Sequence, residues 1–206
     1  QSFNYYYKIV MSKAVFITSH LLSGSHALCE ALDTNKRVSS FSSNAVYKHY
    51  DDFRFLVGRK HKANNTAATY LDELLYNHSF SCKPLYEHCK FIYVVREAKP
   101  TLNGIVTHHN LKHQAALRYY SYRLRRLCEM AKNTPNSLLI TWDDITSGKC
   151  IDPISDFLNL KSNFKINSDF EHYKDFPDNV HYNLIKQGQE SYERHIMYLK
   201  SKLRTC

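Results

Sequence analysis

Apolar runs mark three buried strands in the pattern of hydrophobic and polar positions. Residues 14–18 (AVFIT) and 91–95 (FIYVV) are almost wholly apolar, and residues 137–141 (SLLIT) follow the same pattern. A strand that is covered on both faces needs no alternating polar positions, so it shows as a continuous apolar run. We therefore predict three strands of a parallel sheet, with a fourth over residues 53–57.

A helical spacing marks the segments between these strands. From His113 to Lys132, apolar residues recur at intervals of three and four, which places them on one face of a long helix. The opposite face carries Arg118, Arg125 and Arg126. Shorter patterns predict helices over residues 27–32, 66–76 and 151–160.

The alternation of strands and helices predicts an α/β fold with helices on both faces of a central, mostly parallel sheet. The 206 residues contain no internal repeat and no linker-like stretch, so we expect one domain over residues 13–206. Residues 1–12 are interpreted as a tag remnant or a flexible N-terminal extension. Such sheets place ligands beyond the carboxyl ends of their strands.

Composition and charge narrow the class of partner. Apolar residues make up 43% of the chain, which excludes disordered and collagen-like classes. The net charge of +9 favours an anionic partner. The six cysteines form no CxxC pair, which indicates reduced thiols rather than disulfide bonds. The sequence shows neither a long apolar run nor a leader, so we expect a cytoplasmic protein without a membrane span. The adjacent His108 and His109 point to different sides of a helix, so no metal site is predicted.

The turn after the first predicted strand is the first candidate anion site. Ser23, Gly24 and Ser25 lie between a strand and a helix, where hydroxyls and backbone N–H groups are able to hold a phosphate. The segment lacks the Gly-Lys-Ser/Thr ending of a nucleotide-binding P-loop, which disfavours an ordinary ATPase or GTPase. A purely structural role for Ser25 as a helix cap stays open.

A second candidate follows the strand at 91–95. Arg96 comes directly after this buried strand, and a buried guanidinium requires an anionic partner. That partner is either a carboxylate of the protein or a phosphate of a ligand.

Two further motifs give the chain a family resemblance. Thr141-Trp142-Asp143-Asp144-Ile145 resembles the "Y/W-E-D-L" stretch of sulfotransferases that use 3′-phosphoadenosine 5′-phosphosulfate (PAPS), and Phe157-Leu158-Asn159-Leu160 resembles their "F-L-G-L" stretch. The segments 21–28 and 91–99 resemble the family's phosphosulfate loop and 3′-phosphate element. The order agrees over residues 14–160. The resemblance implies a divergent member with a P-loop NTPase-like three-layer sandwich.

The resemblance also implies roles for individual residues. Ser23, Gly24 and Ser25 would hold the 5′-phosphosulfate, and Arg96 the 3′-phosphate, leaving 3′-phosphoadenosine 5′-phosphate (PAP) as product without a metal. Four further residues are candidates for binding the cofactor, and some of them would replace family residues that this chain lacks. They are His20, His26, Asn103 and Lys186.

Three of these candidates would compensate for two departures from the family pattern. Leu22 stands where a basic residue is expected, so His20 or His26 would supply the charge. Gly104 stands where a Ser is expected, and Asn103 is the nearest polar residue. Lys186-Gln187-Gly188, followed by Tyr192, resembles the family's basic-Gly loop over the cofactor.

The catalytic base is predicted from a "K-T-H" stretch of cytosolic members, which Arg59-Lys60-His61 resembles. His61 would take the acceptor proton with Lys60 as cationic helper, although other branches use Glu. A surface histidine in a basic cluster is the alternative.

Two other function classes stay open at this point. A divergent P-loop kinase shares the topology, and the basic charge suits a nucleic-acid-binding module, although nucleic acid is the less favoured partner. The acceptor is unidentified: segments 34–52, 77–90 and 161–185 suit a sugar, a phenol or an acidic peptide.

Overall fold

The computed structural model describes residues 13–40, 69–74, 88–160, 164–166 and 176–206. Within them, six parallel strands form one sheet in the order β2-β3-β1-β4-β5-β6. The strands are β1 (Ala14–Ser19), β2 (Val38–Ser40), β3 (Thr69–Leu74), β4 (Lys90–Val95), β5 (Ser137–Thr141) and β6 (Arg204–Thr205). The predicted α/β class with a parallel sheet is confirmed.

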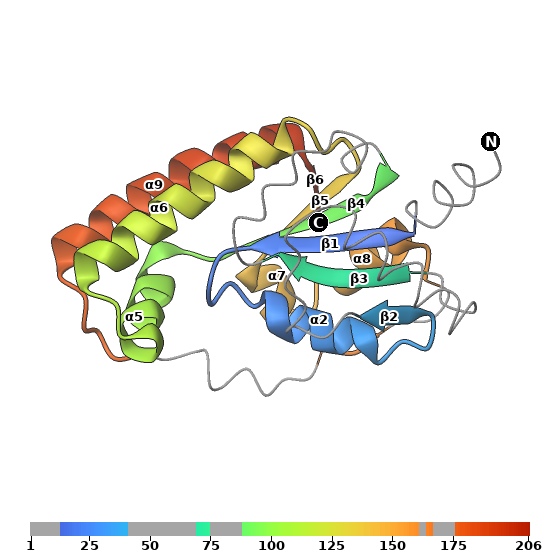
Figure 1. Cartoon of the computed structure of the whole chain (residues 1–206), viewed down its shortest axis with the longest axis horizontal. Helices are drawn as coiled ribbons and strands as arrows, with labels where there is room; N and C mark the ends of the chain where they lie inside the picture. Colours follow the sequence, from blue (N-terminus) through green and yellow to red (C-terminus); the bar gives the residue numbers. More distant parts are fainter. Residues whose placement is uncertain (1–12, 41–68, 75–87, 161–163, 167–175) are drawn as a thin grey trace, which may run out of the picture.

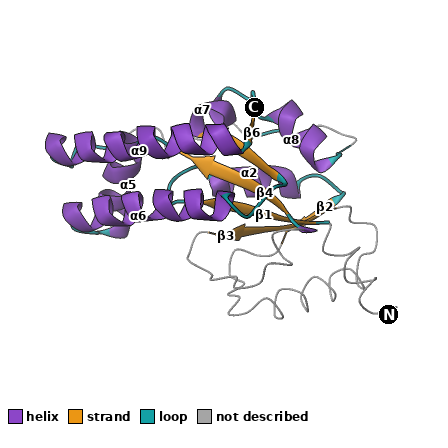
Figure 2. Ribbon diagram, turned by 90° about the horizontal axis from the view of Figure 1, so that it is seen from above, coloured by secondary structure: helices purple, strands orange, loops and turns teal. Residues whose placement is uncertain are grey.

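Helices cover both faces of the sheet, which gives three layers (Figures 1 and 2). One face packs against α5 (Ala98–His109), α6 (His113–Ala131) and α9 (Tyr182–Lys202), and the other against α2 (Ser25–Asp33), α7 (Trp142–Thr146) and α8 (Ile151–Leu158). Each face has its own apolar core. Two-sided burial explains why β1 and β4 have nearly continuous apolar sequences.

The predicted helix over residues 66–76 is wrong, because Thr69–Leu74 forms the strand β3. Its Tyr70 and Leu71 are fully buried on opposite faces of the sheet, and Asp72 is also buried. The two acidic residues interrupt the apolar run that marks β1 and β4, and the remaining apolar positions imitate a helical spacing. The predicted strand at 53–57 lies outside the described residues.

The long helix predicted from His113 is confirmed as α6, and α9 lies beside it (Figure 1). The two helices run in the same direction, because each leads into one of the paired parallel strands β5 and β6. Among the described residues, no helix combines the length and apolar character needed to cross a membrane. Residues 1–12 are not described.

The loop predicted at Lys186-Gln187-Gly188 is wrong, because these residues lie within α9. A Cβ atom on Gly188 would come within 2.8 Å of Leu102 Cδ1 and 3.1 Å of Ala98 Cβ. Glycine therefore serves close packing of α9 against α5 rather than a turn. Lys186 is exposed on this helix.

Candidate functional site

The turn between β1 and α2 has an unusual backbone. Leu22 and Gly24 both have positive φ, at 61° and 94°. Gly24 also lies against Trp142, since an added Cβ would come within 2.6 Å of the indole ring. Conformation and packing therefore both require glycine at this position, which ties the turn to the start of α7.

Ser23 is the feature of this turn that points to a ligand. Its side chain is fully buried, and Oγ has no hydrogen-bond partner within the described part of the chain. Ser25 differs, because its Oγ accepts a hydrogen bond from the Ser19 hydroxyl at 2.9 Å. The first N–H groups of α2 lie beside Ser23 and have no intrahelical acceptors. A buried hydroxyl and a helix N-terminus together form an anion-binding arrangement.

Arg96 is fixed through its backbone at the carboxyl end of β4. Its N–H donates to His20 Nε2 at 2.9 Å, and its carbonyl accepts from the Tyr120 hydroxyl at 2.7 Å. The guanidinium lies 4.1 Å from the centre of the Trp142 ring and donates to the Leu22 carbonyl at 3.4 Å. The turn, β4 and α7 thus meet around one cation.

Burial governs the charge of this cation. It lowers the pKa of Arg96 to about 10, and Asp143 and Glu97 oppose the shift. Arg96 therefore remains charged at neutral pH in a poorly solvated position, where contact with an anion is strong.

His20 connects the turn to Arg96 but carries no charge. Burial lowers its pKa to about 4, and the positive charges of Arg123 and Arg96 act in the same direction. Its Nε2 accepts from Arg96 while Nδ1 lies 2.9 Å from the Leu21 carbonyl, so Nδ1 carries the proton of the neutral ring. The expectation that His20 replaces the charge missing at Leu22 is therefore not met.

His26 does not replace that charge at the turn either. Its imidazole is half exposed and faces Glu30 at 3.3 Å and Glu73 at 3.7 Å. It therefore lies between two carboxylates.

Arg123 supplies a second buried cation that the sequence reasoning missed. This α6 residue donates through Nε to the Ser19 carbonyl at 2.6 Å and through Nη2 to Thr18 Oγ1 at 3.4 Å. It lies on the apolar face of α6, one position before Leu124, where a helical pattern assigns only core. An arginine that interrupts an apolar stripe is the signal that would have found it.

Glu73 is the second missed residue. It lies at the carboxyl end of β3, paired with Ile17 of β1, and its side chain is only 5% exposed. Burial raises the pKa of Glu73, while Ser25 and His26 oppose the shift. Oε1 has no hydrogen-bond partner among the described residues. The sequence signal, a charged residue directly after Thr69-Tyr70-Leu71, was hidden by the wrong helix prediction.

The two residues that depart from the sulfotransferase motifs, Leu22 and Gly104, pack against each other. A Cβ on Gly104 would come within 2.5 Å of Leu22 Cδ1 and 2.6 Å of Phe176 Cε2. The Leu22 side chain and the Phe176 ring therefore occupy the space that a serine at position 104 would need. The residue types at positions 22 and 104 are therefore linked by direct packing.

Asn103 does not face this site. Its side-chain amide donates to Asp178 Oδ1 at 3.0 Å, and its oxygen accepts from the Val180 N–H at 3.1 Å. Both ends of the amide hold the segment before α9, so the structure gives Asn103 a structural role.

Tyr192, the aromatic residue expected after the Lys186-Gln187-Gly188 stretch, lies at the site. Lys186 is exposed and is not among the residues that line the pocket there. Burial raises the pKa of Tyr192 to about 12, with further effects from Glu97 and Asp143. A small pocket is lined by Arg96, Glu97, Pro100, Thr141, Trp142, Asp143 and Tyr192. Lys60 and His61 lie outside the described residues.

Comparison with solved structures identifies the fold. The sulfotransferase domain of the Synechococcus PCC 7002 olefin synthase superposes with a TM-score of 0.54 at 13% identity, covering 91% of this chain and 93% of that domain. The fold is that of the sulfotransferases.

Mouse sulfotransferase SULT7A1, solved with PAP, aligns over 90% of this chain at 17% identity with a TM-score of 0.47. The chain spans 66% of the mouse protein, a little under two thirds of its length. No family model matches the sequence, and no curated protein matches it.

Proposed function

We propose that this protein is a PAPS-dependent sulfotransferase that transfers a sulfuryl group to a hydroxyl of an acceptor. The observation that carries the proposal is the junction of Ser23, Arg96 and Trp142 at the carboxyl edge of the sheet. The indole of Trp142 contacts both the backbone of Gly24, which follows the unpartnered Ser23 hydroxyl in the turn, and the buried, backbone-fixed guanidinium of Arg96. This arrangement suits a ligand with two anionic groups.

The residues present fit the two ends of PAPS unequally. Ser23, Gly24 and the N-terminal N–H groups of α2 would hold the 5′-phosphosulfate. Arg96 would hold the 3′-phosphate without help from position 104, where Leu22 and Phe176 fill the space. PAPS supplies a sulfuryl group on a good leaving phosphate.

Glu73 is the general base in this proposal. Its carboxylate takes the proton of the acceptor hydroxyl as the oxygen–sulfur bond forms and the bond to the leaving phosphate breaks. A pKa raised by burial favours this proton transfer, because a base is most effective when its pKa approaches the working pH. His61, with Lys60 as its helper, stays a competing prediction.

The donor assignment is tested by titrating PAP, AMP and ATP with magnesium against the full chain. We expect PAP to bind about thirtyfold more tightly than AMP, the equivalent of about 2 kcal/mol for one charge-assisted contact. Arg96→Ala should remove this preference, and Arg125→Ala, which removes an exposed arginine, should preserve it. Equal affinity for PAP and AMP in the unaltered protein would refute the role of Arg96, and preference for ATP with magnesium would favour a kinase.

The base is tested by single-turnover rates with an accepted hydroxyl substrate. Glu73→Gln should lower the rate about 10²- to 10⁴-fold while leaving PAP affinity within twofold. The same loss with His61→Ala, and none with Glu73→Gln, would return the role to His61.

A further inference from the structure

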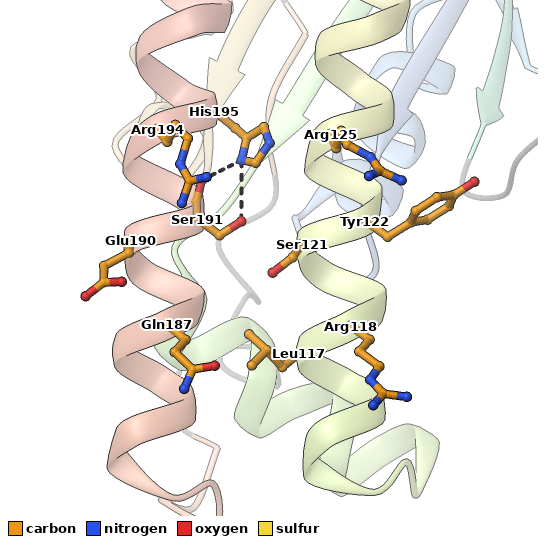
Figure 3. Close-up of a pocket in the computed structure, with 10 residues that line it drawn as sticks. All are labelled: Leu117, Arg118, Ser121, Tyr122, Arg125, Gln187, Glu190, Ser191, Arg194 and His195. Atoms are coloured by element: carbon orange, nitrogen blue, oxygen red, sulfur yellow. Dashed lines mark hydrogen bonds between the residues drawn. The ribbon is translucent and has the colours of Figure 1, made fainter.

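A groove of about 550 Å³ runs between the parallel helices α6 and α9, apart from the site above (Figure 3). Ser121 and Ser191 lie toward its centre, while charged side chains stand on both helices. It is lined by Leu117, Arg118, Ser121, Tyr122, Arg125, Gln187, Glu190, Ser191, Arg194 and His195.

The two rims of this groove carry different charge. On α6, Arg118, Tyr122 and Arg125 follow one another at helical intervals and line this rim with cationic and aromatic groups. Arg125 Nε also lies 3.9 Å from the Glu129 carboxylate, one turn further along α6. The two arginines of this rim are seven positions apart, which places them about 10.5 Å apart along the helix axis. On α9, Glu190 stands one turn before Arg194, so this rim is mixed.

The floor of the groove is already satisfied by internal contacts. His195 Nδ1 lies 2.6 Å from the Ser191 carbonyl and 3.4 Å from the Ser191 hydroxyl. Cys128 donates to the His195 carbonyl from below. The polar groups that these contacts leave for a partner are therefore the Ser121 hydroxyl and those of the exposed rims.

We propose that this groove docks an acidic helical segment of a partner protein. A groove between two side-by-side helices accepts a third helix, and carboxylates seven residues apart on that helix repeat the spacing of Arg118 and Arg125. Guanidinium groups suit carboxylates because they form paired hydrogen bonds with them. This docking does not depend on the proposed sulfotransferase activity.

The mixed rim on α9 argues against a uniform polyanion. A nucleic acid or a sulfated glycan carries regularly repeated negative charge, which Glu190 opposes, whereas a peptide is able to place a lysine beside it. Single-strand binding also relies on aromatic rings for successive bases. The groove lining contains two rings, of which the His195 imidazole is hydrogen-bonded to Ser191 and the Tyr122 ring has the Arg125 guanidinium 5.2 Å from its centre. A second copy of this chain is disfavoured by the net charge of +9.

The test uses two fluorescein-labelled, alanine-based helical peptides of identical composition. The matched peptide has Glu at positions i and i+7 with Lys at i+4. The control peptide has Glu at i and i+5 with the same Lys, so its carboxylates point about 140° apart. We expect fluorescence anisotropy to show at least tenfold tighter binding of the matched peptide.

Variants of the full chain locate the binding. Arg118→Gln combined with Arg125→Gln should weaken the matched peptide at least tenfold. The control pair Lys112→Gln with Lys132→Gln removes the same charge from the exposed N-cap and C-cap of α6, outside the groove lining, and should change the affinity less than twofold. Glu190→Gln should weaken binding of the matched peptide, because the contact with its lysine is lost. The same substitution should strengthen binding of oligothymidylate and heparin.

The other outcomes overturn the proposal. Equal affinity for the two peptides, or equal losses of affinity in the two variant pairs, would mean that the peptides bind only through the overall positive charge of the protein. Tighter binding of oligothymidylate or heparin that depends on Arg118 and Arg125 would assign the groove to a polyanion. Self-association of the unaltered chain that these substitutions abolish would assign it to a second copy.

Discussion

Arginine side chains occur in two contrasting environments in this protein. Those at the carboxyl edge of the sheet are buried, whereas those of the α6–α9 groove are exposed. Arg123 and Arg125 lie two positions apart on α6, yet the first contacts the end of β1 and the second stands on the rim of the groove. Burial lowers the pKa of both Arg96 and Arg123, because the cations have lost water.

The buried arginines are part of the structural framework, and the exposed arginines form a surface for contact with a partner. Arg123 holds a carbonyl at the end of β1, and Arg96 is fixed by His20, Tyr120 and Trp142. Their positions are set by the fold before any ligand binds, which favours a small, defined anion. Arg118 and Arg125 are exposed, and Arg125 is held only by surface contacts with Glu129 and Tyr122, so a partner must order both side chains and specificity must come from their spacing.

The largest expected effect is that of Arg123→Ala. The substitution leaves the Ser19 carbonyl without its charged donor and opens a cavity beneath β1, so we expect the free energy of unfolding to decrease by about 4 kcal/mol. Urea denaturation measures the change, with Arg125→Ala as the exposed control. A loss below about 1 kcal/mol would show that Arg123 is not part of the framework.

The pH dependence of stability tests His20. Its folded pKa of about 4 lies below the unfolded value of 6.5, so protonation favours the unfolded chain. The stabilisation is complete above pH 6.5 and decreases as the pH falls toward 4. Each pH unit is worth about 1.4 kcal/mol, so about 3 kcal/mol is lost over this range.

His20→Gln removes this titration and is the matched comparison. The difference in unfolding free energy between the unaltered protein and the variant should shrink as the pH falls from 6.5 to 4. A constant difference would mean that the imidazole is not buried in its neutral form.

A smaller effect is expected where Leu22 packs over Gly104. Gly104→Ala brings a methyl group against Leu22 and Phe176 and should destabilise the protein by about 2 kcal/mol. Combined with Leu22→Ala, the alanine at 104 should cost about 1 kcal/mol less. A double-mutant cycle in urea measures this coupling. If the two changes in unfolding free energy were strictly additive, Leu22 and the residue at position 104 would not interact.

The smallest effect is expected in the groove. Arg118→Gln with Arg125→Gln should change the free energy of unfolding by less than about 0.5 kcal/mol, because both side chains are exposed. Thermal and urea unfolding measure it. A larger loss would place these arginines in the framework and weaken the contrast between the two regions.

Much of the fold was accessible from the sequence because two-sided burial leaves a plain pattern. The β1, β4 and α6 predictions are confirmed. The prediction failed at β3, where Asp72 and Glu73 lie inside the sheet and break the apolar run. It failed again at Gly188, where packing on Leu102 and Ala98 requires a glycine within a helix. Both errors arise because tertiary contacts override local preferences.

The candidate site was accessible only where a residue follows a recognisable strand. The sequence pointed to Ser23 and Arg96 for this reason, and the structure brings both to the carboxyl edge. It did not reveal that His20 is neutral, since that depends on burial and on two distant arginines. Nor did it reveal Asn103 as a tether, since Asp178 and Val180 are about 75 residues away.

Trp142, which contacts both Gly24 and Arg96, is the only tryptophan of the chain. Its emission therefore reports on the surroundings of this one junction without any label. An anion that displaces the guanidinium or reshapes the turn should alter the fluorescence spectrum. A peptide bound between α6 and α9 should leave the spectrum unchanged, so the protein carries an intrinsic optical probe that distinguishes its two cationic regions.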